Sequence, residues 1–368
     1  MSSQQEFQSI IKSYDEFLSP ILHYNKDFKQ FLEMVKHIYD QYNTDNSINF
    51  HDELLKYRND QKFNFDNPEL SNIIAKLKTI EQPAQRTKEW YEYRNKRLTA
   101  SDLGTAMNVN PYSKRKKLVA KKCGYEETFY AGAAIKHGVK YEDVAIHIYE
   151  QRNKVSIFEY GCIPHPTIPH FGASPDGICD VNSENKEYIG RMLEIKCPKS
   201  RIIDDFIPIH YELQVQGQLE VCGLDFCDYL ECSIKEYELV QEFLDDSGTS
   251  LKTTKTGMEK GVVIETYDPN KDKNVYFYLY DFESKEEIYE WEEKIKSSLT
   301  EVYIKTTYWN LDVYCVKLVE RDTKRFKEEL LPEINSFWED VLKYRVCGYE
   351  SLVYKHLPKE LDFLPDSP

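Results

Sequence analysis

The alternation of polar and non-polar residues is clearest between residues 171 and 198. Two strands are expected there, joined by a polar turn over residues 181–188. In the second strand Glu194 and Lys196 fall on one face, and the non-polar residues beside them fall on the other. A carboxylate and an ammonium group are costly to bury without partners. The pattern therefore predicts either an exposed charged pair on a surface hairpin or a buried polar site.

A second carboxylate comes from the Pro-Asp-Gly kink of the first strand. From that position Asp176 can reach the same end of the sheet as Glu194 and Lys196. Two carboxylates and a lysine in one place suit a divalent cation beside a polarised water or a phosphate. The hairpin is therefore a candidate centre for metal-dependent chemistry.

A third acid lies on a predicted helix. Helical spacing of non-polar residues predicts this helix over residues 133–152, with Glu142 in the middle of the non-polar stripe. A carboxylate in that position needs a strong partner. It could be a structural acid held by a salt bridge, or a metal ligand carried over the hairpin.

The remaining helices and strands follow from the same periodicity. Helices are expected within residues 1–80 and over 207–223, where Gly223 is a suitable C-terminal stop. In the second of these helices Gln214 and Gln218 share one face, which indicates either a polar cavity or a solvated surface. Strands are expected over residues 155–163, 226–233, 261–266 and 275–280.

The C-terminal part of the chain is predicted to be helical from residue 284 onwards. Over residues 302–318 the pattern does not distinguish a helix from a strand. Together the patterns predict a helical N-terminal extension (residues 1–82), a mixed α/β core (83–283) and a helical C-terminal extension (284–368).

Composition bears on compartment and on metal binding. The sequence has no run of about 18 non-polar residues and no signal-peptide core at its N-terminus, so an intracellular protein without a transmembrane helix is expected. Nine cysteines are scattered without any Cys-x-x-Cys pair, which is typical of reduced core residues. Cys222, Cys227 and Cys232 recur at five-residue spacing, and this spacing leaves a metal or iron–sulfur site open.

Charge is unevenly distributed along the chain. The formal net charge is −15, which by itself argues against a nucleic-acid partner. Residues 86–122, however, contain eleven Lys and Arg residues against three acids. Such a local excess indicates a contact with phosphates, or else a solvated helical face.

The basic segment also contains a candidate anion pocket. Thr99 and Asp102 fit a capping box, so a helix is expected to start there with Ser101 in its first turn. Free backbone N–H groups and the helix dipole favour anions at such a start. Arg94 nearby would complete a phosphate pocket, whereas plain helix capping would need no ligand.

Six motifs occur in a fixed order between residues 86 and 233. They read Trp90-x3-Arg94, Thr99-Ala-Ser101, His137-Gly-x3-Glu142, Ser174-Pro-Asp176-Gly, Leu193-Glu194-Ile-Lys196-Cys-Pro and Tyr211-x2-Gln214-x-Gln216. The ordered set resembles the lambda-exonuclease or YqaJ-type viral recombinase branch of the PD-(D/E)XK nucleases. The resemblance implies an α/β (α+β) fold with a central mixed β-sheet flanked by helices.

The resemblance also implies roles for matching residues. Glu142, Asp176 and Glu194, with the backbone carbonyl of Ile195, would hold one or two Mg²⁺ ions, and Mn²⁺ could substitute for Mg²⁺. Lys196 would orient or help deprotonate the attacking water and offset charge on the phosphate. One further role, positioning that water or the lysine, is implied for Gln214.

The family further has a pocket for a 5′-phosphate, which Arg94, Ser101 and Ser174 match. This agrees with the independent argument from the helix start. The basic run would then bind backbone phosphates without reading sequence; its residues are Lys114, Arg115, Lys116 and Lys117.

The leading hypothesis is a metal-dependent 5′→3′ exonuclease that degrades one strand of linear duplex DNA from 5′-phosphorylated ends in recombination or repair. The first alternative is an endonuclease or structure-specific nuclease on the same fold, because a fold does not determine a substrate. The second alternative is a non-catalytic DNA-binding protein that retains the fold.

The resemblance implies two kinds of partner, namely linear duplex DNA ends and a single-strand annealing protein. Phage relatives form rings around duplex DNA, but the regions before residue 80 and after about 240 extend beyond the shared core and leave the oligomeric state open. The Asn-, Lys- and Tyr-rich composition suggests a large DNA virus or an AT-rich genome. A viral protein would then act in the host cytoplasm or nucleus.

Overall fold

The computed structural model of the chain describes residues 68–125 and 132–353. The helices expected within residues 1–67 lie outside the described residues. The N-terminal extension was expected to run to residue 82, whereas the compact unit that the structure describes begins at Pro68. Helix α4 (Pro68–Thr79) places Ile74 and Leu77 in the protein interior.

A seven-stranded sheet forms the centre of the fold, in the order β2-β5-β6-β7-β10-β8-β9. The strands span Ile157–Phe158 (β2), Gly177–Cys179 (β5), Met192–Lys196 (β6), Phe226–Glu236 (β7), Lys260–Asp268 (β8), Lys273–Leu279 (β9) and Val302–Glu320 (β10). Strands β6 and β7 pair in parallel, and the other neighbours pair antiparallel. The sheet is therefore mixed, as predicted.

Helices connect and cover the strands. Their bounds are Lys88–Asn95 (α5), Leu103–Ala106 (α6), Arg115–Lys122 (α7), Ala133–Asn153 (α8), Ile209–Cys222 (α9), Val240–Asp245 (α10), Lys285–Ser298 (α11), Thr323–Arg325 (α12), Leu331–Cys347 (α13) and Glu350–Val353 (α14). A parallel strand pair needs a crossover connection, and α9 provides it between β6 and β7. As predicted, α9 ends at Gly223, which has a left-handed backbone with φ +68°.

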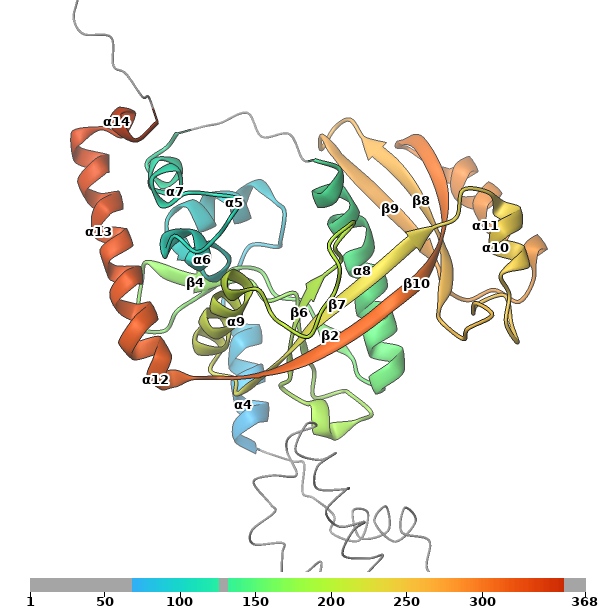
Figure 1. The fold of residues 1–368 in the computed structure, drawn as a ribbon, viewed down its shortest axis with the longest axis horizontal. Helices are drawn as coiled ribbons and strands as arrows, with labels where there is room; N and C mark the ends of the chain where they lie inside the picture. Colours follow the sequence, from blue (N-terminus) through green and yellow to red (C-terminus); the bar gives the residue numbers. More distant parts are fainter. Residues whose placement is uncertain (1–67, 126–131, 354–368) are drawn as a thin grey trace, which may run out of the picture. The chain divides into compact units, whose positions relative to one another are not determined.

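Both faces of the sheet are covered by helices (Figure 1). On one face Met192 of β6 packs in a core with residues of α9 and α13. On the other face Leu193 and Ile195 pack in a core with residues of α8. Because neighbouring strand residues point to opposite faces, Glu194 and Lys196 share the α9 side with Met192. The predicted fold class, a mixed sheet flanked by helices, is confirmed.

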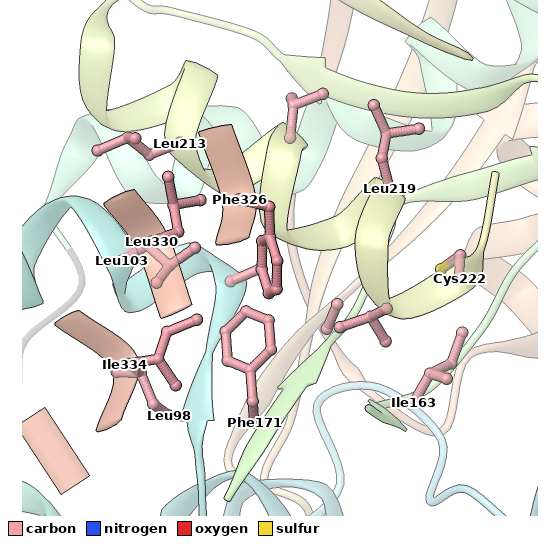
Figure 2. Packing of buried hydrophobic residues seen from close by; sticks show 14 of the residues in the cluster. Leu98, Leu103, Ile163, Phe171, Leu213, Leu219, Cys222, Phe326, Leu330 and Ile334 are labelled. Atoms are coloured by element: carbon pink, nitrogen blue, oxygen red, sulfur yellow. The ribbon is translucent and has the colours of Figure 1, made fainter. Parts of the chain in front are cut away.

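A smaller sheet supports the α9 side. Its strands are β1 (Leu98–Thr99), β4 (Phe171–Ala173) and β3 (Ile163–Pro164), in the order β1-β4-β3. Figure 2 shows Phe171 of β4 lying in one cluster with Leu103 and Phe326, which come from distant parts of the chain. This packing joins the segment that carries Thr99 and Ser101 to the central sheet.

The C-terminal extension, predicted to be helical as a whole, contains a strand at residues 302–320, where the sequence pattern left helix and strand open. This segment forms β10, which pairs with β7 along one edge and with β8 along the other. Figure 1 shows β10 running from α12 to the β8–β9 end of the sheet. Alternate residues Thr307, Trp309 and Leu311 are buried, as expected for a strand packed on one face. The predicted boundary at residue 284 therefore does not separate two structural layers.

Among the helices of the described residues, none is both long and non-polar enough to cross a membrane.

Candidate active site

The predicted acids and lysine meet at the end of the β5–β6 hairpin. Strand β6 supplies Glu194 and Lys196, and Asp176 immediately precedes β5. The antiparallel pairing of Gly177 with Leu193 brings Asp176 beside the end of β6, where its Oδ2 accepts a hydrogen bond of 2.7 Å from the amide of Ile195. The hairpin therefore holds Asp176 and Glu194 at one site.

Glu194 is a buried carboxylate with a complete set of donors. Its exposed fraction is 1%. Oε1 accepts a hydrogen bond from Gln214 Nε2 at 2.6 Å, and Oε2 accepts one from Gln218 Nε2 at 2.7 Å. The ammonium of Lys196 pairs with the same carboxylate. The alternative of an exposed charged pair on a surface hairpin is therefore wrong.

Gln218 is a further residue of the site, and the motifs quoted from the sequence do not include it. Besides bonding Glu194, its Nε2 donates to the carbonyl of Ser174 at 3.2 Å. The signal was its position one turn after Gln214 on the same helix face. Gln216 of the same motif points elsewhere, because it bonds the carbonyl of Glu320 and the amide of Asp322.

The pKa values of Asp176 and Glu142 are raised at the site. Burial raises the pKa of Asp176 well above its usual range, and the negative charges of Glu194 and Glu142 raise it further. Burial also raises the pKa of Glu142, against the opposing charge of Arg86 and with the support of Asp143 and Glu194. Carboxylates that destabilise one another's ionised forms form a favourable environment for a cation.

Two cationic side chains balance the acids. The guanidinium of Arg86 pairs with Glu142 through Nη2 and Oε2 at 2.6 Å. Burial alone would lower the pKa of Lys196, but the charges of Glu194 and Asp176 outweigh this effect and raise the pKa above its ordinary value. Lys196 also lies over the ring of Tyr211, with Nζ 4.8 Å from the centroid.

The donor chemistry of this cluster fits a hard divalent cation. Glu142, Asp176 and Glu194 offer carboxylate oxygens, which are the ligands that Mg²⁺ and Mn²⁺ prefer. In the described residues, no three acidic, histidine or cysteine side chains are already closed around an ion position. Instead, Arg86 and Lys196 are the cations paired with Glu142 and Glu194. A cation bound to these carboxylates would compete with Arg86 and Lys196 for their charge.

A second carboxylate near Lys196 has a structural role. Glu231 lies opposite Lys196 in the β6–β7 pairing and has no exposed surface. It pairs with Arg201 of the loop after β6 and, at 2.6 Å, with Lys317 of β10. A carboxylate neutralised on both sides ties the loop to the sheet and has no ligand position to offer.

The residues predicted for a phosphate pocket, Arg94, Ser101 and Ser174, lie together. Arg94 Nη2 lies 2.7 Å from Ser101 Oγ and 3.2 Å from Thr99 Oγ1, and Nη1 lies 3.3 Å from Ser174 Oγ. Trp90 stacks against the guanidinium, whose carbon lies 4.2 Å from the ring centroid. The structure thus brings together a planar five-donor cation and three hydroxyls, which suits a phosphate.

The capping box predicted at Thr99 is wrong. The Thr99 side chain makes no capping hydrogen bond and donates to Asp102 Oδ2 at 2.9 Å instead. Asp102 also pairs with the buried Lys122 at 2.9 Å, and Lys122 donates to the carbonyl of Arg94 at 3.1 Å. Although burial opposes it, the charge of Lys122 lowers the pKa of Asp102 to about 2. The Lys122–Asp102 pair therefore helps to hold Arg94 and Thr99 in position.

The basic run divides into two faces. Lys114, Lys116 and Lys117 are exposed, as a phosphate-binding surface requires. Arg115 instead faces α13, where Nη1 lies 3.2 Å from Glu333 and Nη2 lies 2.8 Å from Asp340. In this arrangement its guanidinium is used in helix packing, so the expected phosphate contact through Arg115 is not supported.

The cysteine spacing does not build a metal site. Cys222 and Cys227 lie in the core on the α9 side of the sheet, and Cys232 lies in the core on the α8 side. All three are free and buried, and burial raises the pKa of each thiol. Residues separated by the sheet cannot ligate one ion, so these cysteines are core residues.

The sequence was compared with known proteins. The YqaJ-like viral recombinase domain matches residues 89–225. An uncharacterized protein of Acanthamoeba polyphaga mimivirus is 34% identical over 299 residues, which cover 73% of this chain and 54% of that protein. A protein of African swine fever virus (strain Badajoz 1971 Vero-adapted) is 25% identical over 160 residues, covering 38% of this chain and 46% of that protein. The chain spans about half the length of these relatives.

The structure was compared with solved structures. An alkaline exonuclease from Laribacter hongkongensis matches with 20% identity and a TM-score of 0.42, covering 71% of this chain and 95% of that one. A phage related exonuclease from Haemophilus somnus matches with 12% identity and a TM-score of 0.35, covering 70% and 95%. The domain match spans Arg94, the three acids and Gln214. Residues 89–225 of the chain are thus similar to the YqaJ-like viral recombinase domain.

Proposed function

We propose that this chain is a divalent-metal-dependent nuclease that degrades one strand of linear duplex DNA from a 5′-phosphorylated end. The observation that carries the proposal is the short segment 174–176. Ser174 Oγ lies at Arg94 in the phosphate pocket, and the Ser174 carbonyl accepts from Gln218, which also holds Glu194. Asp176, two residues further on, belongs to the acidic cluster.

This shared segment supports a phosphate pocket at Arg94 close to the acidic cluster. A terminal phosphate held by Arg94, Ser101 and Ser174 would place a nearby phosphodiester at the carboxylates. Cutting would then follow the position of the strand end, which is the behaviour of an exonuclease. An endonuclease would have no use for a pocket that binds a terminal phosphate.

Glu142, Asp176 and Glu194 would hold the metal ion, for which Mg²⁺ and Mn²⁺ both fit. When bound, the ion lowers the pKa of a coordinated water and offsets charge on the phosphate. Gln214 and Gln218 fix the orientation of the Glu194 carboxylate through both of its oxygens. Lys196 brings a positive charge to the reacting phosphate, and its three N–H donors can bind a phosphate oxygen or orient the water.

A nuclease assay tests the proposal. Linear duplex DNA labelled at either end is incubated with Mg²⁺ or EDTA, and a covalently closed circle serves as a second substrate. Wild type is compared with Lys196→Ala, and Lys235→Ala, an exposed lysine on β7, is the matched control. We expect stepwise release from 5′-phosphorylated ends, lost in EDTA and in Lys196→Ala but kept in Lys235→Ala.

The other outcomes separate the alternatives. Equal cutting of closed circles would overturn the exonuclease and favour an endonuclease at the same site. No cutting by wild type with any divalent metal would favour the non-catalytic DNA-binding protein. A single-strand annealing protein as partner, a role in recombination or repair, and the oligomeric state stay predictions from the family resemblance.

A further inference from the structure

A strongly exposed aromatic ring lies at the surface next to the candidate active site. Tyr112 follows α6 on the loop that leads to α7, and its exposed fraction is 81%. Leaving so large a ring in water has no benefit for folding. Single exposed aromatic residues are common, so the surroundings of Tyr112 decide whether the ring has a use.

The loop holds Tyr112 in place. The Asn110 side chain accepts a hydrogen bond of 2.9 Å from the amide of Tyr112 and donates one of 2.8 Å to Thr105 Oγ1. The amides of Val109 and Asn110 both donate to the carbonyl of Gly104 at 2.9 Å. A ring on a braced loop loses little conformational freedom when a ligand binds it.

Ring contacts connect Tyr112 to Lys196. Its ring meets that of His210 edge-on, with 6.1 Å between centroids, and His210 contacts Tyr211 at 4.1 Å. Tyr211 in turn lies beneath the ammonium of Lys196. Gly104 allows α6, which precedes the loop, to sit this close to α9, because a Cβ at Gly104 would lie 2.4 Å from the Cβ of His210. A continuous series of contacts therefore connects the exposed ring to Lys196.

Positive charge continues along the chain from the ring. Three exposed lysines follow Tyr112 in the sequence. Lys114 is the N-cap of α7, and Lys116 and Lys117 lie in its first turn. Lysines beside a fixed aromatic ring provide both interactions that a single strand needs, namely phosphate neutralisation and base stacking. A base inside an intact duplex already stacks on its neighbours and shows no free face to a protein side chain.

We propose that Tyr112 is a stacking platform for an unpaired base of single-stranded DNA, in the strand whose phosphate lies at Lys196. The proposal deepens the proposed function and rests on it, because it names the form of DNA that reaches the acidic cluster. Binding is independent of sequence, since every base has a face on which a ring can stack.

Binding without cleavage tests the proposal. The full-length chain in EDTA is titrated into 5′-phosphorylated single-stranded oligonucleotides that carry one 2-aminopurine, moved position by position from the 5′ end. Stacking on a tyrosine quenches this base, so quenching is expected at one or two positions. The same oligonucleotides with a fluorescent end label report affinity through anisotropy, and a blunt duplex is the comparison ligand.

The variants separate stacking from other roles of the residue. We expect Tyr112→Ala to abolish the quenching and weaken single-strand binding about 5- to 150-fold, while duplex binding changes less than about twofold. Tyr112→Phe keeps the ring and should behave as wild type. Tyr289→Ala, which removes an exposed tyrosine from α11, is the matched control and should bind normally. Circular dichroism and thermal unfolding confirm that each variant is folded.

Three results would overturn the proposal. Wild type could fail to bind single strands, Tyr112→Ala could bind them as tightly as wild type, or Tyr112→Phe could lose as much affinity as Tyr112→Ala. The last result would assign the effect to the hydroxyl. Failure of the nuclease assay would leave these measurements intact, because they require no cutting, so the two hypotheses fail separately.

Discussion

At the scale of single residues, the site is built on carboxylates that differ in how they are paired. Glu194 receives two glutamine amides and an ammonium, whereas Glu142 is paired with one guanidinium, that of Arg86. The side chain of Glu142 is also the more exposed of the two. The Arg86 pair is therefore the one that a solvent-borne cation can displace most easily, because exposed ion pairs contribute little net free energy.

Replacing Arg86 should therefore strengthen metal binding. We expect Arg86→Gln to bind Mn²⁺ about fivefold more tightly than wild type, which corresponds to roughly 1 kcal/mol of removed competition. Titration calorimetry or the electron paramagnetic resonance of free Mn²⁺ measures this without DNA.

A matched arginine provides the control for this experiment. Arg152 also pairs with a carboxylate, that of Glu259, with Nη2 2.6 Å from Oε2, and it lies at the C-terminal end of α8, away from Glu142. Arg152→Gln should leave Mn²⁺ binding unchanged. Equal or weaker Mn²⁺ binding by Arg86→Gln would show that Arg86 does not compete for the site.

At the scale of elements, α7 has two faces with different tasks. One face packs into the fold, where Arg115 is held by two carboxylates of α13 and by the carbonyl of Ala106 at 2.9 Å. The other face presents Lys116 to solvent. A run of basic residues in the sequence does not distinguish these tasks, because helical geometry points neighbouring residues in different directions.

Substitutions on the two faces should affect different properties, namely stability on one face and DNA binding on the other. Arg115→Ala should lower the free energy of unfolding by roughly 1–3 kcal/mol, because it leaves charged partners unmatched, without changing the salt dependence of DNA binding. Lys116→Ala should change stability by less than about 0.5 kcal/mol and lower the slope of log affinity against log salt by about 1. Urea unfolding and DNA binding at several salt concentrations measure these effects. A changed slope in a folded Arg115→Ala protein would return Arg115 to the DNA surface.

At the scale of the whole molecule, the C-terminal third completes the central sheet. Strand β10 bonds β7 on one side and β8 on the other, and it also carries Lys317 to the buried Glu231 beside the site. The sheet therefore joins β8 and β9 to the part of the chain that holds the acids. Removing β10 would expose two strand edges and leave Glu231 with one cationic partner fewer.

A chain that ends at Leu299 should fail to fold. We expect it to aggregate and to show no cooperative urea transition, whereas the full chain treated identically should unfold in one. Far-UV circular dichroism and size-exclusion chromatography measure the difference. A monomeric, cooperatively folding product would show that the region matched by the YqaJ-like domain, residues 89–225, is stable without β10.

The sequence alone was enough to identify the local features of the site. Alternation in β6 predicted that Glu194 and Lys196 share a face, and the kink at Asp176 predicted its approach to them. Both follow from geometry within a few residues, since strand periodicity and pairing are short-range properties. Arg94, Ser101 and Ser174 were grouped by a family motif, and the structure places their side chains together.

Only the tertiary structure decided the features that depend on distant partners. The direction of the Arg115 side chain depends on its partners in α13, and the pairing of Arg86 depends on Glu142 of α8. Residues 302–320 form a strand because β7 and β8 lie on either side of them. A strand in the middle of a sheet and a helix can share similar non-polar content, and only the neighbours that complete its hydrogen bonds select one of them. The physical reason is that local periodicity depends only on consecutive residues. Contacts between residues that are distant in the sequence depend on how the whole chain packs.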